Sequence, residues 1–179
     1  MMKVNLIRRF FKHVVSHRWQ VKRHFSDIAF QAIENAIARS EKRHSGEICF
    51  VVEAGLHPYE IVYKKTPKKR AIELFGRLRV WDTEHNNGVL IYLLLADRDV
   101  EIVADRGIDR HVGHDGWELI CHEMELLFRK GEFELGVMLG IEKIGAVLEK
   151  HFSVAETKST KNKRAKSKRN EISNKPIIL

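Results

Sequence analysis

Apolar side chains recur at helical spacing through the first segment of the chain. Arg and Lys residues lie between the members of this stripe, which are Val4, Ile7, Phe10, Phe11, Val14, Val15 and Trp19. The pattern predicts a basic amphipathic helix within residues 1–24. The apolar stripe of such a helix either packs on the protein itself or lies on an anionic membrane surface or a partner, and the sequence leaves both open.

The next stretch alternates helix patterns with a strand pattern. Ser26 stands where an N-cap belongs, ahead of a helix that runs to about Lys42. Residues 47–53 form a run of β-branched and aromatic side chains, which predicts a buried strand. Thr66 and Pro67 begin a second helix, because Pro loses no hydrogen bond at the first helical position. The predicted core face of that helix is Ala71, Ile72, Leu74, Phe75 and Leu78.

The second half of the chain opens with a predicted hairpin. A turn at residues 86–88 precedes an apolar strand over 89–95, and a second strand over 100–104 returns antiparallel to it. A helix is expected from about Asp115 to Arg129, and Gly131 separates it from a last helix over 133–151. These elements predict an α/β fold, a three-layer α/β/α sandwich with a small mixed β-sheet.

Lysine and arginine are concentrated at the two ends of the chain. Residues 1–24 hold seven basic and no acidic residues, and residues 153–179 hold eight basic and two acidic residues. The whole chain carries +8, which leaves −5 for residues 25–152. We therefore divide the chain into a basic helical arm (1–24), an α/β domain (25–152) and a basic tail (153–179). A nucleic-acid-binding domain has a basic face on its folded unit, and here that unit is net acidic.

The basic tail loses nearly all large apolar side chains before Ile177 and is rich in Lys, Arg, Ser, Thr and Asn. This composition predicts that the tail is disordered. Its charge either serves solubility alone or makes electrostatic contact with nucleic acid or acidic lipid.

Cysteine usage and hydropathy bear on location. Cys49 and Cys121 lie in apolar surroundings without CxxC spacing, which favours a reducing compartment. The longest apolar runs are far shorter than a membrane span, and the N-terminus lacks the uninterrupted apolar core of a signal peptide. We expect a cytoplasmic protein without a transmembrane segment, and its basic arms favour a peripheral position at the inner face of the membrane.

Polar side chains converge at the open end of the predicted hairpin. Asn87 precedes one strand, and Asp105 and Arg106 follow the other, so the topology brings them together. The helix expected near Asp115 presents unpaired N–H groups at its start. A hard cation, Ca²⁺ or Mg²⁺, is expected to bind through the oxygens of Asn87, Asp105, Asp109 and Asp115. An anion is expected to bind through the helix N-terminus, Arg106 and His114.

Several pieces of the chain resemble the TPM domain family. They are Asn87-Gly88-Val89-Leu90, the second strand with Val100 and Ile102, the turn Asp105-Arg106-Gly107-Ile108, and the run from Phe128 to Gly136, with Trp81 ahead of them. The resemblance covers approximately residues 26–152 and rests on the order and spacing of these pieces. It implies the same α/β/α sandwich.

The resemblance also implies what the domain does. A plant thylakoid member of the family is associated with acid phosphatase activity, and some relatives bind calcium. The second turn of the family commonly has the sequence Gly-Tyr-Gly, where this chain has Asp105-Arg106-Gly107. A metal site at this turn would therefore differ from that of the family.

Three functions remain open on these grounds. We favour a non-catalytic interaction module at the cytoplasmic membrane surface, where an anionic lipid surface or a membrane protein is the partner. The alternative is an acid-phosphatase-like phosphomonoesterase or phosphate-binding enzyme assisted by Ca²⁺ or Mg²⁺, with Asp105 and Arg106 as the catalytic candidates. The second alternative is nucleic-acid contact through the basic tail.

Overall fold

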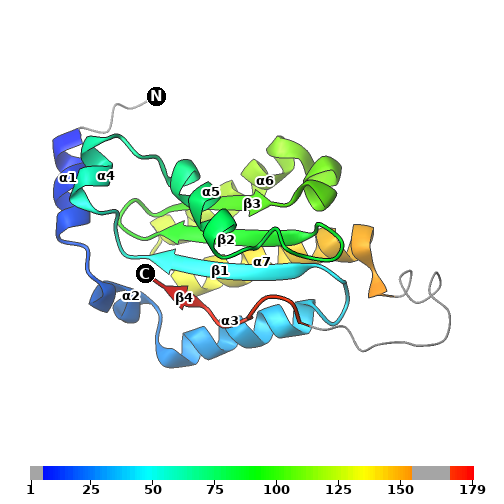
Figure 1. Ribbon diagram of the computed structural model, residues 1–179. Coiled ribbons are helices and arrows are strands. Elements are labelled where there is room, and N and C mark those ends of the chain that lie inside the picture. Colours follow the sequence, from blue (N-terminus) through cyan, green and yellow to red (C-terminus); the bar gives the residue numbers. More distant parts are fainter. Residues whose placement is uncertain (1–5, 155–169) are drawn as a thin grey trace.

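The computed structural model describes residues 6–154 and 170–179. Its elements, in chain order, are α1 (Leu6–Val14), α2 (Arg18–His24), α3 (Asp27–Ser40), β1 (Glu47–Glu53), α4 (Pro58–Val62), α5 (Pro67–Arg77), β2 (Gly88–Leu94), β3 (Asp99–Ala104), α6 (Arg106–Arg129), α7 (Phe133–Phe152) and β4 (Ile177–Ile178). Figure 1 shows their arrangement in space.

The described strands form one mixed sheet in the order β3-β2-β1-β4. β1 pairs parallel with β2, from Glu47 opposite Gly88 to Glu53 opposite Leu94, and β2 pairs antiparallel with β3. Every residue of β1 and β2 is buried, as expected for strands covered by helices on both faces. The prediction of a small mixed sheet with a hairpin is confirmed.

Helices cover both faces of this sheet and give the predicted three-layer sandwich (Figure 1). Side chains alternate along β1, as they do along any strand. Ile48, Phe50 and Val52 belong to the core shared with α3, α6 and α7. Cys49 and Val51 belong to the core beneath α4 and α5.

Side-chain caps start two helices where the sequence predicts them. Ser26 Oγ accepts a hydrogen bond from a first-turn N–H of α3 at 3.1 Å, and Thr66 Oγ1 does the same for α5 at 3.2 Å. One residue of the predicted core face of α5 is exposed, since 52% of Ile72 is accessible. Ile72 lies about 100° around the helix from the buried Ala71, beyond the edge of the packed face.

The basic N-terminal arm forms two helices instead of the single helix that its apolar stripe predicts. α1 ends at Val14, and α2 follows His17, whose backbone is extended with φ −123° and ψ 158°. Between them the Ser16 hydroxyl donates to the Lys12 carbonyl at 2.7 Å, a local bond that competes with helix continuation. The change of direction allows Val21 of α2 to be fully buried.

The helix predicted from about Asp115 begins nine residues earlier. α6 starts at Arg106, with Asp105 as its N-cap, and is interrupted at Gly113, where φ is 70°. A positive φ is costly for every residue except glycine, so Gly113 marks the break. The part of α6 after Gly113 corresponds to the predicted helix. The residues predicted as a turn, Asp105-Arg106-Gly107, form the cap and first turn of an additional helical segment.

The last ten residues lie against the sheet, so the prediction that the whole tail is disordered is wrong at this end. β4 pairs parallel with β1, with Ile177 opposite Val51 and Ile178 opposite Val52. A strand of two residues is too short to produce a recognisable pattern in the sequence. Residues 155–169 carry most of the basic charge of the tail, and the predicted contact with nucleic acid falls on them, outside the described residues.

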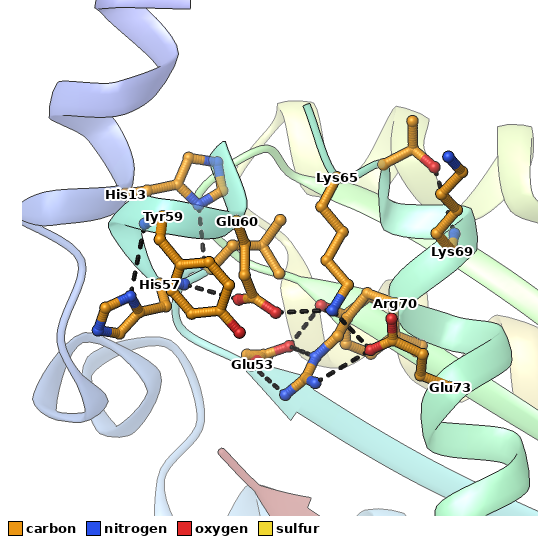
Figure 2. A network of polar contacts seen from close by, with 12 residues as sticks. His13, Glu53, His57, Tyr59, Glu60, Lys65, Lys69, Arg70 and Glu73 are labelled. Atoms are coloured by element: carbon orange, nitrogen blue, oxygen red, sulfur yellow. Dashed lines mark hydrogen bonds and ion pairs between the residues drawn. The ribbon is translucent and has the colours of Figure 1, made fainter. Parts of the chain in front are cut away.

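A network of ion pairs around the buried Glu53 joins the sheet to α5 (Figure 2). Arg70 donates to both carboxylate oxygens of Glu53, at 2.8 and 2.9 Å, and the Tyr92 hydroxyl donates to the same carboxylate at 2.6 Å. The hydrogen bonds to Glu53 raise the pKa of Arg70, and burial raises the pKa of Tyr92. Both side chains therefore keep their protons and remain donors to Glu53.

Lys65 extends this network to α4 (Figure 2). Its Nζ lies 2.7 Å from Glu60 and 2.6 Å from Glu73, and Glu73 is 3.6 Å from Arg70. Glu60 also accepts a hydrogen bond from the His57 N–H at 2.9 Å, within the capping box that starts α4. The short helix α4 is therefore fixed through alternating charges to the end of β1.

Asp99, at the start of β3, lies close to other carboxylates. Burial and the charges of Glu101, Glu125 and Asp97 raise the pKa of Asp99 to about 7. The folded protein therefore retains a proton at Asp99 over a pH range in which the unfolded chain has lost it.

We predict that Arg70→Met lowers the free energy of unfolding by about 3–5 kcal/mol, because it leaves the Glu53 carboxylate buried without its cation. Denaturant unfolding measures the effect. Arg77→Met is the matched control, since Arg77 lies on the same helix with its side chain exposed. The role assigned to the network is wrong if the two variants are equally stable.

We also predict that Asp99 reduces stability at high pH. Between the unfolded pKa near 4 and the folded pKa of about 7, the folded state binds more protons, so stability falls as pH rises through this window. Asp99→Asn should raise the melting temperature by about 2–4 °C at pH values above this window. At the acidic end of the window the substitution should change the melting temperature little. An equal change at both ends would contradict this account, and the exposed Asp115→Asn serves as the control.

Candidate functional site

The two ends of the parallel β1–β2 pair carry different side chains. Asn87 and Asp105 lie at the end where β1 and β2 begin and β3 finishes. Helices α1 and α4 lie at the opposite end, beyond Glu53 (Figure 1).

Asn87 and Asp105 are brought together by the hairpin, as the sequence predicts. The Asp105 N–H donates to the carbonyl of Gly88 at 2.9 Å, directly beside the pairing of Val89 with Ala104. Asn87 is 1% exposed, and its Nδ2 donates to Ser45 Oγ at 3.1 Å. This end of the sheet therefore holds a buried amide before β2 and a buried carboxylate after β3.

Each of these two side chains keeps one buried oxygen without a hydrogen-bond partner among the described residues. Asp105 Oδ1 accepts a hydrogen bond from the Arg106 N–H at 2.7 Å, but Asp105 Oδ2 and Asn87 Oδ1 accept none. Buried polar oxygens in native proteins are nearly always satisfied, by protein, water or an ion. An amide oxygen and a carboxylate oxygen suit a hard cation such as Ca²⁺ or Mg²⁺.

Close backbone packing fixes the walls of this end. A Cβ on Gly107 would lie 2.3 Å from the Asn86 carbonyl oxygen, and one on Gly88 would lie 1.9 Å from the Val80 carbonyl oxygen. Both distances are far below van der Waals contact, so only glycine fits at these two positions. The first turn of α6 is thereby pressed against the turn that precedes β2.

The other side chains of the predicted site lie at the surface. Asp109 Oδ1 accepts a hydrogen bond from Trp117 Nε1 at 2.9 Å, and Asp115 and Arg106 are exposed. His114 is exposed and lies 3.9 Å from Glu118. Within residues 6–154 and 170–179, no three His, Cys, Asp or Glu side chains gather as ligands for a metal ion. The structure thus unites Asn87 with Asp105 and directs Asp109 to a structural contact.

An acidic cavity between β3 and α6 was not foreseen from the sequence. It has a volume of 190 Å³ and is lined by Asp99, Val100, Glu101, Glu118, Cys121, His122 and Glu125. The sequence signal for this cavity is the spacing of its acidic residues. Asp99 and Glu101 are two apart on a strand, and Glu118 and Glu125 are two turns apart on a helix.

Burial raises the pKa of Cys121 to about 12, so its sulfur stays a thiol. Burial likewise raises the pKa of Cys49 to about 12, and neither cysteine has the character of a nucleophile.

The opposite end of the molecule carries an exposed apolar surface. Of the 14 large apolar side chains that are exposed in the described chain, seven lie on α1, α2, α4 or the residues next to them. We call these seven the N-terminal surface: Phe11, Val14, Val15, Trp19, Tyr59, Val62 and Tyr63. Exposed cations lie among them, namely Arg8, Lys12, Arg18, Lys22 and Lys64.

Polar contacts hold α1 in place together with Phe10, the residue of its apolar stripe that packs against the core beneath α4 and α5. Nδ1 of the buried His13 accepts a hydrogen bond from the Leu56 N–H at 2.9 Å, and its Nε2 lies 3.1 Å from Asp97. Arg9 Nε also donates to Asp97, at 3.0 Å. Burial would raise the pKa of Asp97, but the contacts with His13 and Arg9 outweigh it and keep that pKa low. Because these contacts fix α1, Phe11 and Val14 are left facing outward.

None of the helices in the described ranges combines the length and the apolar character needed to cross a membrane.

Comparisons with known proteins support a family assignment. The chain is similar to the NMR structure of the BA42 protein from the psychrophilic bacterium Bizionia argentinensis, with 30% identity, a TM-score of 0.70, and coverage of 87% of this chain and 95% of that one. A solution structure of the N-terminal domain of a protein from P. gingivalis shares the fold, with 19% identity and a TM-score of 0.57 over 72% of this chain and 78% of that chain. No curated protein matches the chain.

The family model described as the TPM domain matches residues 22–147. This range contains both ends of the sheet described above, from α2 to most of α7. The resemblance found in the sequence is thereby confirmed, and the chain belongs to the TPM domain family.

Proposed function

We propose that this protein is a non-catalytic interaction module that docks on an anionic membrane surface through its N-terminal surface. The observation that carries the proposal is the exposure of apolar side chains on both helices of the arm, of which α1 is held in place by buried polar contacts: Phe11 of α1 is 62% exposed and Trp19 of α2 is 58% exposed. A helix with aromatic and aliphatic residues on one side and Arg and Lys around them suits the interface of a bilayer.

The charge of the arm favours acidic lipids over neutral ones. Residues 1–24 hold seven basic and no acidic residues. Each Lys or Arg near an anionic leaflet contributes about 1 kcal/mol of attraction, which salt screens. The two buried thiols, Cys49 and Cys121, are consistent with a reducing compartment, so we propose the cytoplasmic face of the membrane.

We predict that the full chain floats with phosphatidylcholine vesicles only when they contain phosphatidylserine, and that high salt releases it. The double variant Phe11→Ser and Trp19→Ser should weaken this binding roughly tenfold or more, because it removes exposed apolar area that would enter the interface. Both side chains are exposed, so the melting temperature should stay close to that of the wild type.

Trp81→Ser is the control for this experiment, since Trp81 is a 49% exposed aromatic residue that follows Val80, whose carbonyl packs on Gly88 at the opposite end of the sheet. Equal loss of binding in both variants, or no flotation of the wild type with phosphatidylserine at low salt, would refute membrane docking.

The second candidate function is a divalent-cation-assisted phosphomonoesterase or phosphate-binding protein at the Asn87–Asp105 end of the sheet. Its supporting observation is the pair of buried oxygens, Asn87 Oδ1 and Asp105 Oδ2, that lack partners in the described chain. A bound cation would supply positive charge that neutralises a phosphate group. Arg106 and His114, both exposed on α6, are the candidates to contact the phosphate.

For this candidate we predict that Ca²⁺ or Mg²⁺ shifts the backbone amide signals of Asn87 and Asp105 together and saturably in NMR spectra. Asp105→Asn should weaken the cation affinity roughly tenfold or more, because it removes the negative charge from the site. Asp109→Asn is the control and should leave the affinity nearly unchanged, since that carboxylate bonds to Trp117.

Two results would count against the cation site. One is the absence of any amide shift at millimolar cation, and the other is an equal effect of the Asp105 and Asp109 substitutions. If the cation binds, an assay with a generic phosphomonoester distinguishes an enzyme from a cation-binding module. Hydrolysis that the substitution Asp105→Asn abolishes indicates an enzyme.

A further inference from the structure

The last ten residues of the chain include β4, which pairs with the edge of β1 that faces away from β2. The Leu179 N–H donates to the Val52 carbonyl at 3.0 Å, and the Ala54 N–H is 3.5 Å from the Leu179 carbonyl. Arg18 of α2 donates to the Ile178 carbonyl at 2.7 Å. The chain end is therefore held by backbone pairing on one side and by an arginine from the N-terminal arm on the other.

Two buried carboxylates receive donors from the residues that precede β4. Glu41 is 6% exposed and accepts a hydrogen bond from Asn174 Nδ2 at 2.9 Å. Glu47 is fully buried, and its carboxylate lies 3.4 Å from the Ile172 N–H. This part of the β1 edge therefore favours segments that present N–H donors, and it disfavours segments with acidic side chains.

The apolar side chains of the bound segment go to opposite faces of the sheet. Ile177 packs against the core beneath α4 and α5, and Ile178 packs against the core shared with α3, α6 and α7. Both are only half-buried, and the ladder with β1 has two residue pairs. Segments held by so few buried contacts open far more readily than the core strands.

We infer that the β1 edge is a docking site for an extended peptide of another protein, and that residues 170–179 occupy it as a displaceable internal ligand. An exposed strand edge binds extended peptides by adding a strand to the sheet. The resident segment defines the chemistry of the partner: two consecutive branched apolar residues at the end, and an amide-bearing or cationic side chain three residues before them, opposite Glu41.

This site adjoins the N-terminal surface at Arg18, but peptide binding to it is measured without lipid, so the inference does not rest on membrane docking. The resident segment is tethered to the β1 edge, so it competes at a high effective concentration and weakens the binding of any peptide in trans. Releasing the resident segment should therefore increase the affinity of the β1 edge for an added peptide.

The test measures binding of a fluorescent synthetic peptide with the sequence of residues 170–179 to the full chain. Wild type should bind it weakly, and the tail variant Ile177→Asp with Ile178→Asp should bind it at least tenfold more tightly. A peptide carrying the same two aspartates should not bind either protein. The substitution Glu41→Gln, added to the tail variant, should lower the affinity, since its amide group repels the Asn174 donor.

Hydrogen exchange gives a second measurement on the same proteins. The amide of Ala54 should exchange faster in the tail variant and regain its protection when the peptide is added. The inference is overturned if the folded tail variant binds the peptide no better than wild type, or if the peptide restores no protection at Ala54. Formation of dimers that exchange their own tails would also overturn the assignment to a foreign peptide.

Discussion

The pairing of Glu53 with Arg70 is the constraint on which the layer formed by α4 and α5 depends. β1 is buried along its whole length, and it ends in a carboxylate that is only 6% exposed. A charge in such a place is tolerated only with a cation and further hydrogen bonds. Arg70 supplies the cation and Tyr92 the further hydrogen bond, so α5 and β2 must both meet β1 at this point.

From this point the network determines the position of α4, and α4 in turn packs against α1 (Figure 2). Lys65 joins Glu60 to Glu73, and Glu60 caps the start of α4. Asp97 holds His13 and Arg9 of α1. Ile61 of α4 and Phe10 of α1 pack in the core beneath α4 and α5, and the polar contacts fix the same two helices. Other apolar side chains of these helices therefore remain exposed and form part of the N-terminal surface.

The sequence was sufficient to predict the features that depend on local pattern. Ser26 and Thr66 start helices because their side chains cap the first turn, and the run 89–95 forms the central strand because it is uniformly apolar. The meeting of Asn87 with Asp105 also followed, since a hairpin brings the start of one strand beside the end of the other.

The features that sequence reasoning missed depend on long-range contacts or on ambiguous local signals. Aspartate favours turns and N-caps alike, so the sequence predicts a turn at Asp105, and only the packing of Gly107 on Asn86 makes Asp105 an N-cap instead. β4 could not be seen, since two apolar residues form a strand only where β1 offers its edge. The acidic cavity needed residues of β3 and α6 to be placed face to face.

The fold places the basic N-terminal arm and the Asn87–Asp105 pair of the acidic domain at opposite ends of the sheet. The acid-free arm lies at the end of the sheet where β1 and β2 finish, and the Asn87–Asp105 pair lies at the end where they begin (Figure 1). A protein docked through its N-terminal surface would therefore hold the buried oxygens away from the bilayer, facing the aqueous phase that supplies cations and phosphate. The β1 edge holds β4 opposite Val51 and Val52, beside the arm, whose Arg18 donates to the Ile178 carbonyl. The peptide site and the N-terminal surface therefore adjoin at Arg18, while the Asn87–Asp105 pair lies at the opposite end of the same sheet.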